Sequence, residues 1–486
     1  MNLGWLEQLY ADYGLGLPLL AGAAVVLAGF AFSVALSVHA LSKRHQRNTV
    51  AWLALIWTSP VIGWLSYVLL GINRVQRRAQ RLSDGAPASV GPPLPDDADV
   101  APQHEHLVRL ARASGAITGK PLLAGNHFEP LRNGDEAYPA MLAAIHAAQT
   151  SVALLTYILD DDRAGEPVLD ALIAAHRRGV AVRVLIDGIG ARRASKGLRR
   201  LKRAGVPHRS FLWSWLPWKM ALINLRNHRK LLVVDGNSAF TGGINIRQAY
   251  LHRDNPGPLA CDLHFRVRGP VVRELQRQFA LDWAFEGGDT LSGPTWFPEL
   301  SPVGSSLARV LPDGPDEDLL KIQRVLFQAV TLAKSEVLVF TPYLLPDEAL
   351  TAALEAAAQR GVDVRLVLPA TNEPALMNPL TVEDLGPSLA HGVKLGFKQG
   401  PFEHTKLALV DGAWVLLGSS NWDPRSLRLN FELCVEVYDP ELATQTREVM
   451  QPVLDAVRWV RPEDLDQRTR LAVLGTRVLR LFKPYL

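Results

Sequence analysis

Two long apolar stretches open the chain, and short apolar runs that alternate with amphipathic helical segments follow them. Residues 15–38 and 50–72 carry no charged side chain, and each stretch is long enough to cross a hydrocarbon core of about 30 Å. The pattern predicts two transmembrane helices within an N-terminal membrane region, residues 1–81. Because Pro60 and Gly63 interrupt the second stretch, a re-entrant or interfacial segment is the alternative interpretation.

Cationic residues around these stretches bear on orientation. Three fill the connector and four follow the second stretch, so two full crossings favour a cytoplasmic location for the rest of the chain by four to three. If the second stretch is re-entrant, both groups lie on the cytoplasmic side. A cleaved signal peptide fits less well, because Glu7 and Asp12 precede the first stretch, which is also too long. The cations are Lys43, Arg44, Arg47, Arg74, Arg77, Arg78 and Arg81.

Residues 82–105 form a segment rich in proline, glycine, alanine and aspartate, without a periodic apolar pattern. Such a composition leaves little to pack and keeps the chain extended, so we predict a flexible linker. His104 and His106 lie at its end, and we expect them to be solvated linker residues and not metal ligands.

From about residue 107 onward, strands alternate with helices, and the later part of the pattern repeats the earlier part. In each part a short apolar strand, a helix that ends at a glycine and a β-branched strand follow in the same order. The duplication predicts an α/β fold of two pseudo-symmetric α/β/α halves, residues 106–300 and 301–486. The matching segments are 151–157 with 335–343, 169–178 with 350–360, and 181–187 with 363–369.

Composition excludes few classes of protein. The net charge of +4 and the pI near 9.0 are too mild for a chain of 486 residues to indicate nucleic acid, and they fit an anionic membrane surface equally well. Cys261 and Cys434 are the only cysteines, and neither lies in a metal-ligand spacing. We expect both to be reduced and buried, in a domain that faces a reducing compartment.

The strongest chemical signal is a motif that occurs twice. His228, Lys230 and Asp235 form an H-x-K-x4-D block, and His404, Lys406 and Asp411 repeat it 176 residues later. Each block runs into a glycine-rich turn that ends in asparagine, at Asn245 and at Asn421. With one copy on each half, we predict one shared site at the interface between the halves. Imidazole can act as nucleophile or as general acid and base, while lysine and asparagine donate hydrogen bonds to anionic oxygens.

The paired H-x-K-x4-D-x6-G-[GS]-x-N blocks resemble those of the phospholipase D superfamily, and the chain as a whole resembles the bacterial cardiolipin synthases. The resemblance covers nearly every part except the proline-rich linker. It implies a duplicated phospholipase D-type domain, whose halves share one active site, behind two N-terminal transmembrane helices. Besides the two apolar stretches, it rests on residues 133–138, 241–246, 341–347 and 425–432.

The motif residues also suit phosphoryl transfer on physical grounds. The transition state of a phosphodiester needs donors around its non-bridging oxygens, and Lys230, Lys406, Asn245 and Asn421 provide a symmetric set. With these donors no metal and no cofactor is required. One imidazole attacks phosphorus in line while the other protonates the leaving alkoxide, which gives a phosphatidyl-histidine intermediate.

The resemblance implies that His228 is the nucleophile and His404 the general acid and base, although the symmetric sequence leaves the reverse assignment open. It also implies that an acid after each motif, Asp262 and Glu432, orients a histidine. Gly243 and Ser419 are expected to let the backbone approach the phosphate, with a plain tight turn as the alternative.

Asp235 and Asp411 complete the catalytic motifs, but each sits at a strand end just before a glycine. We interpret them as supports of the motif through a turn hydrogen bond or an ion pair, and direct catalysis is the alternative.

Four further segments are candidates for contact with lipid or with the acceptor alcohol. Residues 259–262 and 370–399 depart from the pattern of the cardiolipin synthases, and we expect them to border a head-group pocket. Residues 211–219, with three tryptophans, fit an interfacial contact or a buried aromatic cluster equally well. Leu471, Leu474 and Val478 recur at helical spacing near the C-terminus. That amphipathic helix either packs on the domain or lies on the membrane.

The sequence thus predicts a cardiolipin synthase that joins two phosphatidylglycerols and releases glycerol. A phospholipase D hydrolase, or a transferase that uses another alcohol, is the alternative, and a non-catalytic lipid-binding scaffold is the second one. The expected partners are phosphatidylglycerol, other anionic phospholipids and the membrane, with no nucleic acid, and protein partners are not specified. The expected location is the bacterial inner membrane, as a multi-pass protein with a cytoplasmic catalytic domain.

Overall fold

The computed structural model describes residues 16–42, 46–68, 105–212, 225–253, 255–316, 318–372, 374–466 and 470–480. These residues fall into two compact units, Met1–Arg77 and Arg78–Leu486, which are described separately. The predicted linker, up to residue 104, lies outside the described residues, and so do residues 213–219 of the tryptophan-rich segment.

The first unit contains one helix that can span a membrane. Helix α2 (Gly16–Leu41) includes Ala21–Leu41, the only segment of the described chain that is long and apolar enough to do so. The second apolar stretch forms α3 (Gln46–Thr58) and α4 (Pro60–Ser66). The 13 residues of α3 extend only about 20 Å, so a second crossing is not confirmed.

The break between α3 and α4 turns the chain back on itself. A Cβ atom on Gly63 would lie 2.2 Å from the Leu55 carbonyl oxygen, although eight residues of straight helix would separate the two by about 12 Å. Trp57 and Trp64 donate their indole N–H groups to Ser37 and Ser33 of α2, at 3.0 and 2.8 Å. Over the described residues the second stretch is thus a pair of helices joined by a sharp turn and not one continuous helix.

The second unit is built on one mixed sheet, which has 16 strands within the described residues. Its order, β18-β13-β12-β11-β15-β16-β17-β10-β1-β9-β7-β6-β2-β3-β4, is nearly palindromic about the β10–β1 pair. The first-half strands are β1 (Leu123–Arg132), β2 (Ser151–Thr156), β3 (Ala181–Asp187), β4 (His208–Phe211), β6 (Leu231–Val234), β7 (Ser238–Gly242) and β9 (Leu263–Arg268). The second-half strands are β10 (Ser306–Asp313), β11 (Glu336–Phe340), β12 (Asp363–Pro369), β13 (Lys394–Lys398), β15 (Leu407–Val410), β16 (Trp414–Gly418), β17 (Asn430–Tyr438) and β18 (Val457–Trp459). The predicted duplicated α/β fold is confirmed.

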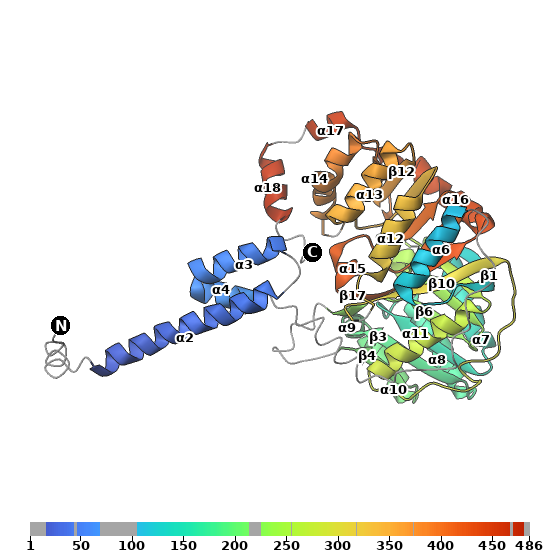
Figure 1. Ribbon diagram of the computed structural model, residues 1–486. Coiled ribbons are helices and arrows are strands. Elements are labelled where there is room, and N and C mark those ends of the chain that lie inside the picture. The colour runs from blue at the N-terminus through green and yellow to red at the C-terminus, as the bar shows by residue number, and fades with distance from the viewer. Residues whose placement is uncertain are drawn as a thin grey trace, which may run out of the picture. The chain divides into compact units, whose positions relative to one another are not determined.

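Helices cover the sheet (Figure 1). Alternate β2 residues, Val152 and Leu154, join a core with α7 and α8, and α11 packs on β2, β6, β7 and β9. The second half repeats this arrangement with α12, α13 and α16. The helices are α7 (Asn133–Ala147), α8 (Gly165–Arg177), α9 (Gly188–Arg193), α10 (Ser195–Arg203), α11 (Val271–Phe285), α12 (Lys321–Leu332), α13 (Glu348–Gln359), α14 (Met377–Leu389), α15 (Pro424–Arg428), α16 (Pro440–Asp455), α17 (Pro462–Asp466) and α18 (Arg470–Arg480).

Helix α6 (Glu105–Thr118) precedes the first half in sequence but packs with the second half, beside α12 (Figure 1). Its Leu107 and Leu110 belong to the core of the second half. The His106 side chain is only 11% exposed, and its Nε2 atom lies 2.8 Å from Asp411 Oδ2. The expectation that His106 is a solvated linker residue is therefore wrong, because the helix begins one residue before it.

The predicted C-terminal amphipathic helix is α18. It packs on α14 through its cations, because Arg477 pairs with Glu383 at 2.8 Å and Arg480 with Asp384 at 2.7 Å. Leu474 and Val478 are 60% and 50% exposed. The helix thus packs on the domain, as one alternative predicted, but with its polar side. Cys261 and Cys434 are both free and buried, as predicted.

Candidate active site

Two short cross-connections between the halves position the motif histidines. Strand β5 (Arg226–Asn227) pairs in parallel with β17, and β14 (Phe402–Glu403) pairs in parallel with β8 (Ala260–Cys261). The hydrogen bonds continue into the motifs, because His228 N–H donates to Phe431 C=O at 2.9 Å and His404 N–H donates to Cys261 C=O at 2.7 Å. Each histidine is therefore fixed to the opposite half of the molecule.

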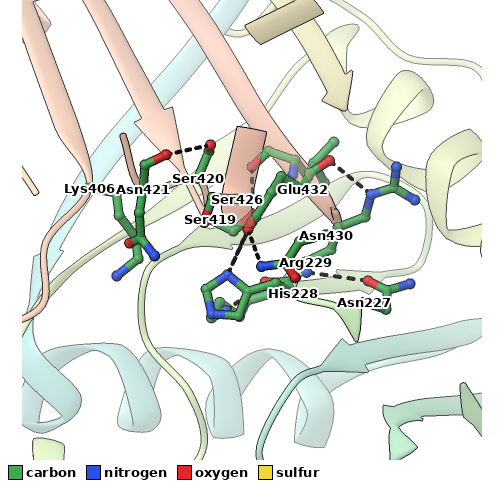
Figure 2. A network of polar contacts seen from close by, with 12 residues as sticks. Asn227, His228, Arg229, Lys406, Ser419, Ser420, Asn421, Ser426, Asn430 and Glu432 are labelled. Carbon is green, nitrogen blue, oxygen red and sulfur yellow. Dashed lines mark hydrogen bonds and ion pairs between the residues drawn. The ribbon is translucent and has the colours of Figure 1, made fainter. Parts of the chain in front are cut away.

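The acids predicted to orient the histidines do contact them, in a crossed arrangement. His228 Nδ1 lies 3.0 Å from Glu432 Oε1, and His404 Nδ1 lies 2.7 Å from Asp262 Oδ2. Figure 2 shows His228 pointing at Glu432, which Asn430 also contacts. Because each Nδ1 atom is engaged, the Nε2 atom of each ring remains for chemistry.

The two acids have different surroundings. Ser419 Oγ donates to Glu432, and Asn430 Nδ2 donates to it at 3.1 Å. At the position that corresponds to Ser419, the first half has Gly243, where a Cβ atom would lie 2.3 Å from Asp262 Oδ1. Gly243 and Ser419, predicted to face the phosphate, thus lie against the carboxylates and do not line the cavity.

Electrostatics distinguish the two pairs further. Burial lowers the pKa of His228 to about 4, so its imidazole is neutral near pH 7. Burial raises the pKa of Glu432, but the facing imidazole, Lys230 and Ser419 outweigh burial and hold this pKa below its usual value. The first pair is therefore a neutral histidine beside an ionised carboxylate.

The second pair, His404 and Asp262, keeps a proton up to a higher pH than the pair of His228 and Glu432. Burial raises the pKa of Asp262 to about 7, against the opposing charge of Lys406. Burial, followed by the charges of Lys406 and Lys230, lowers the pKa of His404 well below its usual value. Tyr250 Oη also lies 3.1 Å from His404 Nδ1. Near neutral pH this pair carries a proton, mainly on the carboxyl group.

The motif lysines lie close behind the histidines. Lys230 Nζ donates to the His228 carbonyl oxygen and Lys406 Nζ to that of His404, each at 2.5 Å. Burial lowers the pKa of Lys230 to about 7 and that of Lys406 to about 8. An anionic ligand between the halves would favour the charged form of both amines.

A cavity of about 750 Å³ opens between the halves. His228, Asn245, His404 and Asn421 line it, so the structure brings both motif histidines and both asparagines together at the interface between the halves. The two stretches predicted to border a head-group pocket reach it through Ala260 and through Thr371, Asn372, Pro374 and Met377. Within the described residues, no group of three or more His, Cys, Asp or Glu side chains is arranged to hold a metal ion.

Asp235 and Asp411 lie outside this cavity. Asp235 accepts the backbone N–H groups of residues 149–151, and Asp411 accepts those of residues 334–336. Both have positive φ values, 49° and 52°, at the turns that follow β6 and β15. The two carboxylates therefore hold the starts of the central strands β2 and β11.

Sequence reasoning missed several residues that line the cavity. The Tyr157 ring packs edge-on against His228 with a centroid distance of 4.9 Å, and its counterpart Tyr343 also lines the cavity. The sequence signal that could have indicated both tyrosines is their equivalent position at the ends of the matched segments 151–157 and 335–343. Arg226 and Arg247 also line the cavity, and no sequence pattern indicated them, whereas Arg425 begins one of the segments that carry the family resemblance.

Two pseudo-symmetric α/β/α halves, with a histidine, a lysine and an asparagine from each gathered at one interface, define the phospholipase D class of phosphoryl-transfer proteins. Within this class the chain matches the family described as cardiolipin synthase, PLD-like domain, over residues 141–283 and 326–454. Residues 31–71 match the family described as phospholipase D-nuclease N-terminal. The chain belongs to the cardiolipin synthase family of the phospholipase D superfamily.

Proteins similar in sequence agree with this placement. The chain is 31% identical over 459 residues to the cardiolipin synthase of Geobacillus kaustophilus, with 92% of this chain and 91% of that protein covered. It is 32% identical over 463 residues to cardiolipin synthase A of Pseudomonas syringae pv. syringae, with 93% and 95% covered. Phosphatidylserine synthase from Haemophilus influenzae has the same fold, with a TM-score of 0.60, 16% identity, and 78% and 100% coverage.

Proposed function

We propose that this protein is a membrane-associated phosphatidyltransferase that joins two phosphatidylglycerols to give cardiolipin and glycerol. The observation that carries the proposal is the pair of crossed histidine–carboxylate contacts beside one cavity. Family relatives that span most of the chain support the choice of phospholipids as donor and acceptor.

The first step forms a covalent intermediate. Since Glu432 is ionised, it accepts the Nδ1–H of His228 and leaves the lone pair on Nε2 free to attack phosphorus. A bond forms between this nitrogen and phosphorus, and the bond from phosphorus to the glycerol oxygen breaks. The product is a phosphatidyl-histidine on His228 and a free glycerol.

The second pair supplies the proton for the leaving group. Protonated Asp262 donates to Nδ1 of His404, so the neutral imidazole carries its own hydrogen on Nε2. His404 gives this proton to the departing glycerol oxygen while the Asp262 proton moves to Nδ1. In the return step His404 takes the proton of the acceptor hydroxyl, which attacks phosphorus and releases His228.

Four donors stabilise the transition state in this account. Lys230 and Lys406 provide charge, and the amides of Asn245 and Asn421 provide hydrogen bonds to the non-bridging oxygens. Asp235 and Asp411 take no chemical part and support the strands behind the motifs.

We also propose the division into a membrane region, a linker and two halves, in which α6 precedes the first half in sequence but packs on the second half. For the membrane region we propose a multi-pass topology, with the catalytic domain in the cytoplasm.

A product analysis tests the function. The purified protein is incubated with labelled phosphatidylglycerol in mixed micelles, and the lipids are separated. Cardiolipin with an equal amount of glycerol is the expected result. Phosphatidic acid alone would identify a hydrolase, and unchanged substrate would identify a lipid-binding scaffold, so either outcome contradicts the proposal.

A further inference from the structure

The walls of the cavity do not share the symmetry of its catalytic groups. Two residues after the motif asparagines, the first half has Arg247 where the second half has Asp423, and both line the cavity. A cation therefore stands at one end of the cavity, and the matching place at the other end holds Asp423 with Arg425 close by. This asymmetry separates two ends of a site whose chemistry is nearly symmetric.

Arg247 stands at the His404 end. Tyr250, whose hydroxyl oxygen lies 3.1 Å from His404 Nδ1, donates its backbone N–H to the Arg247 carbonyl oxygen at 3.3 Å. The backbone of Arg247 is fixed, because Tyr138 Oη donates to its carbonyl oxygen at 2.9 Å. The Arg247 side chain is 35% exposed, and its Nε lies 3.5 Å from Asp160 Oδ2, an ion pair that is longer than a hydrogen bond. It can therefore accept a second anion.

A buried acceptor group lies beside the same cavity. Asn372 is 8% exposed and lines the cavity, and its Oδ1 atom has no hydrogen-bond partner among the described residues. Its Nδ2 atom donates to the Pro342 carbonyl oxygen at 3.0 Å, which places Asn372 next to Tyr343. Such an unpaired buried oxygen costs free energy unless a ligand hydroxyl donates to it.

The proposed reaction requires a second anion site at this end of the cavity. The acceptor hydroxyl must approach His404, and in phosphatidylglycerol that hydroxyl belongs to a glycerol whose other end carries a phosphodiester. The two phosphates are thus held one glycerol apart, where their charges repel each other strongly away from water. The four motif donors are already committed to the reacting phosphate.

We infer that Arg247 and Asn372 form the acceptor subsite, in which Arg247 binds the phosphodiester of the acceptor phospholipid and Asn372 accepts a hydrogen bond from its glycerol. The subsite rests on the proposed function and specifies its acceptor. It combines a loop of the first half with a segment of the second half that departs from the family pattern. Water and uncharged alcohols reach the intermediate without using this arginine.

The test separates donor from acceptor. A short-chain phosphatidyl-nitrophenol serves as donor, and either phosphatidylglycerol or glycerol serves as acceptor for the full-length protein in mixed micelles. Arg247→Ala should raise the KM for phosphatidylglycerol by about ten- to a hundredfold, the range of a charge-assisted hydrogen bond, and should affect nitrophenol release and transfer to glycerol much less. Phosphatidic acid should rise as water replaces the charged acceptor.

Two further variants show whether the effect of Arg247→Ala is specific to the charge at that position. Arg247→Lys keeps the charge and should recover part of the preference for phosphatidylglycerol over glycerol. Arg425→Ala is the matched control, because Arg425 also lines the cavity but lies near Tyr157 and His228. Burial raises the pKa of Tyr157, and the charges of Arg226 and Arg425 oppose this rise. Arg425→Ala should keep that preference. If Arg425→Ala loses the preference, or if Arg247→Ala keeps it or blocks nitrophenol release, the inference is overturned. Absence of cardiolipin with the unaltered protein would instead overturn the proposed function.

Discussion

At the scale of single residues, two carboxylates decide what two equivalent histidines can do. Glu432 stays ionised because the facing His228, Lys230 and Ser419 outweigh burial and hold its pKa below the usual value. Burial raises the pKa of Asp262, which receives no hydroxyl at the Gly243 position, to about 7. The sequence predicted all eight of the motif histidines, lysines, asparagines and orienting acids. It did not predict the crossed pairing, since two short strands at the interface determine it.

The first prediction separates these carboxylates. Glu432→Gln should reduce formation of the covalent intermediate about a thousandfold or more, even with a nitrophenyl donor, because His228 loses the charge that fixes its tautomer. Asp262→Asn should slow turnover of phosphatidylglycerol comparably but spare intermediate formation from the nitrophenyl donor, whose leaving group needs no proton. Rapid mixing with detection of nitrophenol measures both. Equal losses in the two variants would contradict the assignment.

A second prediction concerns His264, a buried histidine that takes no part in the chemistry. Burial, and then the charge of Lys230, lowers its pKa to about 3, well below the value of about 6.5 in an unfolded chain. Between these values the unfolded state binds more protons, so this histidine costs stability as the pH falls below about 6.5, by about 1.4 kcal/mol per pH unit.

Buried acids with raised pKa values, such as Asp187 and Asp423, act in the opposite direction, so the comparison must be made against a matched variant. His264→Gln cannot take up the proton. Measured as Tm in detergent at pH 7 and at pH 5, the unaltered protein should lose stability relative to His264→Gln on acidification. A constant difference in Tm between the two proteins would show that this histidine titrates normally when folded.

At the scale of elements, the short strands β5 and β14 do more for the site than the long strands of the sheet. They carry each motif histidine to the acid of the opposite half, and their two-residue length gives no periodic signal. The strands β3 and β12, by contrast, have the predicted bounds, because a run rich in β-branched residues is a strong strand signal in the sequence. Helix α6 was missed because its partners lie in the distant second half.

The third prediction tests the motif aspartates as strand supports. Asp235→Asn and Asp411→Asn should each lower the free energy of unfolding by about 1–3 kcal/mol, because a neutral amide cannot accept the cluster of backbone N–H groups equally well. Intermediate formation at a temperature where both variants are folded should change only a few-fold. A loss of several orders of magnitude without a fall in Tm would instead make these residues catalytic.

At the scale of the whole molecule, duplication and fusion of an α/β unit account for a site that neither half contains alone. Each half provides a complete histidine, lysine and asparagine set but borrows the orienting acid from the other. The duplication and the family could be predicted because the motif repeats with its downstream turn. For the second apolar stretch, Pro60 and Gly63 indicated an interruption, but the sequence did not determine how sharply the chain reverses there.

The residue that carries the covalent intermediate shows which histidine is the nucleophile of the shared site. The protein is exposed briefly to a phosphatidyl-nitrophenol donor, denatured, digested and examined by mass spectrometry. We expect an adduct on His228 in the unaltered protein and in His404→Ala, and none in His228→Ala. An adduct on His404 in the His228→Ala protein, or cardiolipin synthesis without any histidine adduct, would contradict this assignment.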